Sequence, residues 1–161
     1  MALSDQMPPS TGSATAGTDP TTPGTTPGAD DDVEKGDIIE LIVPALSTYL
    51  SVVRTATAGL AARLSFTFDE IEDLRIAVDE ACAMLLSLPG PGDPTTLTCR
   101  FRVLPEALAV TVSTPVDEKA VMPMEQSFAW QVLTAHAAEV NGSADHGIAS
   151  VELLKRRRPA R

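Results

Sequence analysis

Glu80 is the residue whose type and surroundings best suit a chemical role in this sequence. It lies within the stretch Phe68–Leu88, where apolar residues recur every three or four positions, as they do along one face of an α-helix. Ala77 and Met84 lie about one helical turn away on either side of it. A carboxylate in such company is either a placed functional group or a residue at the rim of a buried face.

Arg54 is the second candidate, because no other charged residue accompanies it. The rest of the outward face of its predicted helix is small and uncharged, and consists of Ser47, Ser51, Thr55, Ala58 and Ala62. A small-residue face with one arginine suggests contact with another chain. The alternative, an arginine paired with a nearby carboxylate of its own chain, has equal weight on this pattern alone.

The cysteines and histidines do not predict a metal site. Cys82, Cys99, His136 and His146 show none of the spacings that metal-binding motifs use. Cys82 falls in a predicted helix and Cys99 in a predicted strand. This placement suits buried free thiols in a reducing cytoplasm better than a disulfide framework.

Charge is distributed unevenly along the 161 residues. Residues 1–35 hold six acidic residues and one lysine, residues 36–154 hold sixteen acidic and six basic residues, and the last seven hold five basic ones. An acidic body argues against binding a nucleic-acid backbone, and favours a basic partner or simply solubility. No apolar run approaches the ~18 residues that span a bilayer, and no signal peptide is apparent, so we expect a soluble, cytoplasmic protein.

Three segments are predicted from composition. Residues 1–35, rich in Thr, Pro, Gly, Ser, Ala and Asp, are predicted to be a disordered acidic leader. Residues 36–155 form the predicted domain, with 43% hydrophobic but only 4% aromatic residues in the whole chain, so its core is aliphatic. Residues 156–161 form a basic tail.

The elements that position these residues follow from hydrophobic periodicity. Strands are predicted over Gly36–Val43, Thr95–Leu104, Leu108–Ser113 and Ile148–Leu154, and helices over Ala45–Leu64, Phe68–Leu88 and Gln126–Val140. In the third helix the residues predicted to face inward are Phe128, Val132, Leu133, Ala135 and His136, and Asn141-Gly142 ends it. The order β-α-α-β-β-α-β predicts an α+β fold, a two-layer sandwich in which three helices cover one face of a mixed β-sheet.

Three segments carry a resemblance to a known family. They are PALSTYLSVVR (44–54), FDEIEDLRIAVDEACAML (68–85) and SFAWQVLTAHAAEV (127–140). The chain resembles the anti-sigma-factor serine kinases of the RsbW and SpoIIAB type, in particular their actinobacterial members, over about residues 37–155. The resemblance implies the Bergerat, histidine-kinase-like ATPase fold.

The motifs of the active kinases are altered here. In the family, a glutamate of the central helix acts as general base, and an asparagine four positions later holds magnesium. Glu80 matches the base, but the second position is Met84, and a thioether is a poor ligand for a hard cation. The family's D-x-G-x-G motif corresponds to a stretch without glycine, in which Asp117 is a remnant.

The third family motif, the G-x-G of the ATP lid, falls on Ser127 and Ala129. Their Cβ atoms obstruct the close backbone approach that phosphates need. We therefore predict that no ATP or Mg²⁺ cofactor is used, that Glu80 is a relic of the base, and that the chain does not phosphorylate. ATP and Mg²⁺ would bind only if this altered site were still competent.

One family feature is retained. The resemblance implies that Arg54, with Ser51 and Thr55 beside it, contacts partners. The implied function is an anti-sigma factor that sequesters an alternative, stress-response or sporulation-type sigma factor and is released by a STAS-type anti-anti-sigma factor. The implied protein is a homodimer through its first helix and strand, without direct nucleic-acid or membrane contact. The alternatives are an active serine kinase that phosphorylates the anti-anti-sigma factor and a non-catalytic scaffold with another partner.

Overall fold

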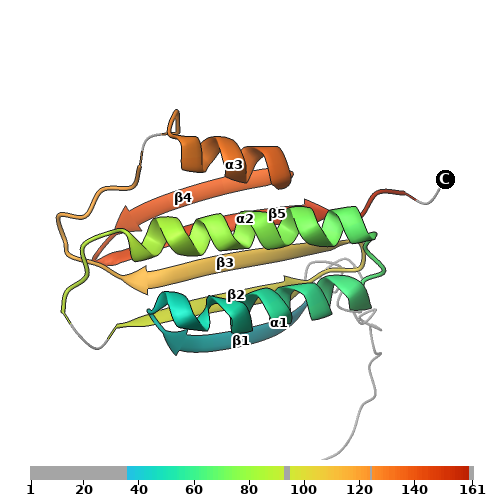
Figure 1. The fold of residues 1–161 in the computed structure, drawn as a ribbon, viewed down its shortest axis with the longest axis horizontal. Helices are drawn as coiled ribbons and strands as arrows, with labels where there is room; N and C mark the ends of the chain where they lie inside the picture. Colours follow the sequence, from blue (N-terminus) through green and yellow to red (C-terminus); the bar gives the residue numbers. More distant parts are fainter. Residues whose placement is uncertain (1–35, 93–94, 124, 160–161) are drawn as a thin grey trace, which may run out of the picture.

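The computed structural model describes residues 36–92, 95–123 and 125–159, and it consists of two layers (Figure 1). The sheet contains the strands β1 (Asp37–Pro44), β2 (Thr96–Val103), β3 (Ala107–Pro115), β4 (Glu139–Asp145) and β5 (Ile148–Arg156). One face of the sheet is covered by the helices α1 (Leu50–Arg63), α2 (Phe68–Leu86) and α3 (Phe128–His136). The predicted α+β two-layer sandwich is confirmed. The leader predicted over residues 1–35 lies outside the described residues.

All four strand pairings in the described sheet are antiparallel, in the order β1-β2-β3-β5-β4. The prediction of a mixed sheet was wrong in this respect. The two consecutive helices between β1 and β2 return the chain in the opposite direction. Strands β3 and β4, which α3 connects, run parallel to each other, but β5 lies between them and pairs antiparallel with both.

Strand β4 was not predicted, because Asn141, Gly142 and Asp145 are residue types that strands disfavour. The prediction that Asn141-Gly142 ends the third helix was wrong: α3 ends at His136, and these two residues lie within β4. The indole ring of Trp130 explains the glycine. A Cβ at position 142 would lie 2.9 Å from that ring, so only bare backbone fits there.

The helices begin where local hydrogen bonds satisfy their first amide groups. Thr67 and Glu70 form a reciprocal capping box at the start of α2, in which the Glu70 carboxylate accepts from the Thr67 amide at 2.8 Å. Burial would raise the pKa of Glu70, but the hydrogen bonds from Thr67 and from the backbone of Arg158 outweigh it and lower that pKa. Helix α1 begins at Leu50, later than predicted, after a 3-10 turn over Ser47–Tyr49.

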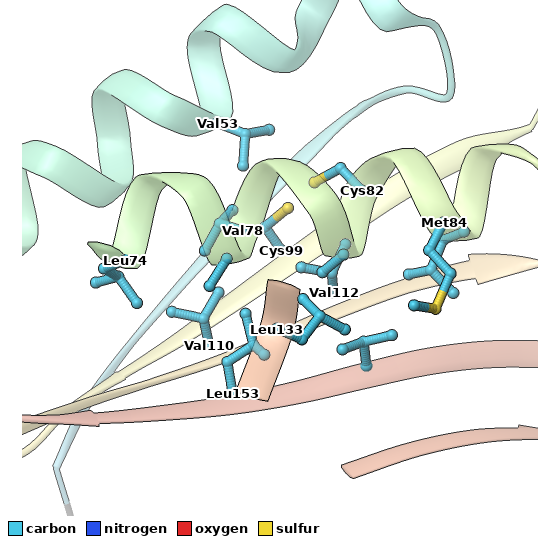
Figure 2. Close-up of a cluster of buried hydrophobic side chains, with 14 of the residues drawn as sticks. Val53, Leu74, Val78, Cys82, Met84, Cys99, Val110, Val112, Leu133 and Leu153 are labelled. Atoms are coloured by element: carbon cyan, nitrogen blue, oxygen red, sulfur yellow. The ribbon is translucent and has the colours of Figure 1, made fainter. Parts of the chain in front are cut away.

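Helix α2 is central in the helical layer, and its apolar face fills the core (Figures 1 and 2). The stripe predicted for it is confirmed, since Leu74, Val78 and Leu85 are at most 1% exposed. The prediction that Cys82 and Cys99 are buried free thiols is also confirmed. A hydrogen bond to Cys99 and burial raise the pKa of the Cys82 thiol, so it stays protonated at neutral pH.

The inward face predicted for α3 is partly wrong. Phe128 is 77% exposed and Ala135 is also exposed, whereas Leu133 is fully buried and Trp130, not predicted to be inward, is 7% exposed. The buried stripe runs through Trp130 and Leu133, and Phe128, two positions earlier, lies about 200° around the helix axis from Trp130. Among the described residues, no helix combines the length and the apolar character needed to cross a membrane.

Candidate functional site

Arg54 lies on the surface of α1 that faces α2. Its Nη1 donates a hydrogen bond to Oδ2 of Asp79 on α2 at 3.0 Å. The two side chains remain 39% and 35% exposed. Both interpretations drawn from the sequence therefore hold together, because Arg54 pairs with a carboxylate of its own chain and is still accessible to another molecule.

Two adjacent pockets share Arg54 as a lining residue. The first, of about 560 Å³, is lined by Ser51, Arg54, Thr55, Ala58, Gly59 and Arg75. The second, of about 300 Å³, is lined by Leu50, Arg54, Ile76, Asp79, Glu80 and Ala83. We call these two pockets together the α1–α2 groove. The groove brings together three of the predicted partner-binding residues and Glu80.

The charged groups of the groove influence one another. Burial raises the pKa of Asp79, and the charges of Arg54 and Arg75 only partly offset this effect. Arg75 forms an ion pair with Glu72, one turn earlier on α2. Its Nε atom is buried and has no hydrogen-bond acceptor within the described residues. Arg75 thus carries a donor that the chain itself leaves unsatisfied.

Glu80 and Met84 have different environments, although they lie one turn apart on α2. Glu80 is half-buried and opens into the groove. Met84 is 4% exposed and belongs to the apolar core (Figure 2). The structure therefore places the predicted relic of the base beside Arg54, and it places the methionine at the expected magnesium position away from solvent.

The other predicted nucleotide-site residues have local structural roles. Asp117 is exposed in a turn, where its Oδ1 accepts from the backbone of Lys119 at 2.8 Å. Ser127 is the N-cap of α3, and its side chain accepts from the backbone of Trp130 at 3.5 Å. Ala129 is half-buried in the first turn of the same helix. None of the five best-formed pockets on the described part of the chain is lined by these residues or by Met84.

Three residues of the site region were missed by sequence reasoning. Asp79 and Arg75 are spaced four apart on α2, which brings them to one helix face, and this signal was present in the sequence. Gly59 was visible only as a glycine in a helix. No group of three metal-ligating side chains lies close enough to hold an ion in the described ranges.

Comparison with known proteins gives a consistent relationship. The chain is 39% identical to the serine-protein kinase RsbW of Bacillus subtilis over 82 residues, which is 50% of this chain and 51% of that protein. It is 36% identical to RsbW of Bacillus pumilus over 83 residues, again 50% and 51%. No family model matches the chain.

Over half of its length, the chain is similar to the RsbW serine-protein kinases. The resemblance inferred from the three sequence segments is therefore confirmed. The chain spans about half the length of the curated relatives it matches.

A solved structure has the same fold. The RsbU and RsbW domains of Rv1364c from Mycobacterium tuberculosis align with a TM-score of 0.57 and 16% sequence identity, covering 78% of this chain and 34% of that one. At this level of identity the likeness establishes the fold alone. It agrees with the five-stranded sheet and three covering helices described above.

Proposed function

We propose that this chain is an anti-sigma factor. It holds an alternative sigma factor of the stress-response or sporulation type and releases it when a STAS-type anti-anti-sigma factor competes for the same face. The observation that carries the proposal is the accessible Arg54 in the α1–α2 groove of a chain similar to RsbW kinases. The acidic body, with sixteen acidic and six basic residues over 36–154, is complementary to a basic partner.

We also propose that this anti-sigma factor works without kinase activity. Three observations support the absence of a nucleotide site: Met84 is buried in apolar surroundings, Asp117 is used in a turn, and Ser127 caps α3 where the lid glycines of the family would lie. Release of the sigma factor then depends on competition between partners, or on modification of a partner by another kinase.

A second candidate function is an active serine kinase that phosphorylates the anti-anti-sigma factor. Two observations favour it: the curated relatives are named serine-protein kinases, and Glu80 is retained at the position of their base. Isothermal titration with Mg-ATP separates the two functions. We expect no binding at micromolar concentrations, whereas micromolar affinity followed by transfer of radiolabel to a STAS partner would establish the kinase.

Binding to sigma factors tests the principal proposal directly. The purified alternative sigma factors of the source organism are each titrated against the full-length chain, and we expect one of them to bind. Arg54→Glu weakens that complex by about tenfold or more, because the variant opposes like charges in a partly buried contact. Arg63→Glu, at the exposed end of the same helix, is the matched control and leaves affinity unchanged.

The remaining parts of the proposal concern assembly and location. We propose a homodimer through β1 and the start of α1, because β1 is an edge strand with exposed Ile38 and Ile42, and Tyr49 and Val52 are exposed nearby in the sequence. A protein that holds sigma factors acts in the cytoplasm. Sedimentation of the chain at several concentrations tests the dimer.

A further inference from the structure

Arg75 and Gly59 add two unexplained features to the groove. Gly59 lies inside α1, where a glycine costs the helix roughly 0.5–1 kcal/mol relative to alanine. A Cβ at this position would have no heavy atom within 4 Å outside its own part of the helix, so packing within the chain does not require a glycine. The open space points outward into the pocket that Gly59 lines.

Arg75 lines the same pocket from α2. Its guanidinium pairs with Glu72 through Nη1, while Nε is left without an acceptor in the described part of the chain. A buried donor that lacks an acceptor is unfavourable by about 1–3 kcal/mol. An incoming carboxylate that draws Arg75 away from Glu72 would satisfy both Nε and Nη, in the two-pronged geometry that arginine prefers.

We infer that the α1–α2 groove is an acceptor site for an acidic segment of the protein partner, whose carboxylate side chain inserts between Arg54 and Arg75 while its backbone passes over Gly59. This inference rests on the proposed function, since the partner is the sigma factor that binds the Arg54 face. It adds a second anchoring arginine on α2 and gives the chemical class of the partner residue. On a strongly acidic body, two arginines in one pocket of small side chains select for negative charge.

Each arginine already has a carboxylate of its own chain, Asp79 for Arg54 and Glu72 for Arg75. These pairs are half-exposed and therefore weak, so a carboxylate held by a larger interface can replace them. The groove thus presents its positive charge only to a partner that brings its own acid. A neutral or basic segment would leave Arg75 as it is and gain nothing from it.

The first experiment measures binding of the purified sigma factor to three variants of the full-length chain. Gly59→Met fills the pocket without an internal clash, and Arg75→Glu reverses the charge; each is expected to weaken the complex by about tenfold. Arg75→Lys keeps the charge but loses the planar fork, and an intermediate loss is expected. Ala62→Met and Arg63→Glu are the controls, since both positions are exposed on α1 and outside the pocket lining.

The outcomes separate the two proposals. If a sigma factor binds the unmodified chain and both Gly59→Met and Arg75→Glu bind it as tightly, the groove inference is overturned and the anti-sigma function stands. If no sigma factor binds, the proposed function fails, and the groove is judged by a second measurement that needs no partner. Thermal unfolding of each variant verifies that it is folded.

That second measurement titrates glutarate, a small dicarboxylate, into the nitrogen-15-labelled chain and follows the arginine Nε–Hε signals by NMR. We expect saturable shifts for Arg75 and Arg54, and no comparable shift for Arg63. Loss of the Arg75 response in Gly59→Met would confirm that the anion enters this pocket. Equal, non-saturating shifts of all three arginines would overturn the inference.

Discussion

The two sides of helix α2 differ in how they are filled. Toward α1, the groove is lined by small side chains and two half-exposed ion pairs, and it holds open space. Toward α3, Trp130 and Leu133 are buried together with Met84 in the apolar core. The same helix therefore presents an accessible polar surface to one side and a close-packed apolar surface to the other. A site for a partner can exist on the first side, whereas the second side contributes stability.

Gly59 and Gly142 show the same contrast at the level of single atoms. An added Cβ meets nothing at Gly59, on the α1 side, and meets the Trp130 ring at 2.9 Å at Gly142, on the α3 side. Glycine at position 142 is explained by packing within the chain. Glycine at position 59 is not, and this difference led us to look for a partner there.

Removal of Trp130 is expected to have the largest effect on the closed side. Trp130→Ala leaves a cavity between α3 and β4 and removes the hydrogen bond from Nε1 to the Pro123 carbonyl at 2.7 Å. We expect the free energy of unfolding, measured with urea, to fall by about 3–5 kcal/mol. Phe128→Ala on the same helix, at a side chain that is 77% exposed, should change it by less than about 0.5 kcal/mol. Similar losses for both would mean that Trp130 does not anchor α3.

Met84→Asn restores the residue that the family uses to hold magnesium, and it tests whether the closed side can reopen. A buried amide without a partner should lower the free energy of unfolding by about 1–3 kcal/mol, and we expect no gain in Mg-ATP binding. Met84→Leu, a swap of similar volume, should lower it by less than about 1.5 kcal/mol. Nucleotide binding by the asparagine variant would show that a single side chain closes the site.

Asp73 connects the closed side across three elements. Its carboxylate accepts from Lys155 Nζ of β5 at 2.8 Å and lies 2.9 Å from His136 Nδ1 of α3. The Lys155 hydrogen bond is the main cause of a lowered pKa for Asp73, which outweighs the effect of burial. A carboxyl whose pKa is lower in the folded state adds stability at pH values above its unfolded pKa of about 3.9.

Asp73→Asn should therefore lower the free energy of unfolding near neutral pH by about 1–2 kcal/mol. The difference from the unmodified chain should shrink as the pH falls below about 4 and through the lower native pKa of Asp73. Urea unfolding of both proteins along a pH series measures it. A difference that stays constant down to the acid limit would show that the charge on Asp73 is not what stabilises this side.

Sequence reasoning captured the parts of this comparison that depend on periodicity. The three-four spacing of Leu74, Val78 and Leu85 predicted the buried face of α2, and the isolation of Arg54 identified the accessible face of α1. It missed strand β4, because residue types that strands disfavour are accepted at a sheet edge where Trp130 needs bare backbone. Contacts between distant residues decided that case, and local propensity cannot contain them.

The site shows the same boundary between local and distant information. Glu80 and Met84 were expected to share a helix face on the basis of a four-residue spacing. In the structure one opens to the groove and the other is buried, because a 3.6-residue repeat rotates the second about 40° further round, toward the core. The pairing of Arg75 with Glu72 follows from local spacing, but its unsatisfied Nε is apparent only in the folded chain.

The smallest expected effect on stability has an unusual sign, and it sharpens the comparison most. Gly59→Ala should raise the free energy of unfolding by about 0.5–1 kcal/mol, because alanine favours the helix and its methyl group meets nothing. Gly142→Ala should lower it, because its methyl group would overlap the Trp130 ring.

A stabilising substitution that nevertheless weakens partner binding would mean that Gly59 serves the complex at a cost to the isolated domain. If Gly59→Ala stabilises the chain and leaves partner affinity unchanged, one methyl group is tolerated, and the bulkier Gly59→Met then sets the limit of approach. If Gly59→Ala destabilises the chain, the open space on the α1 side is misjudged. The contrast between the two glycines, and with it the contrast between the two sides of α2, would then fail.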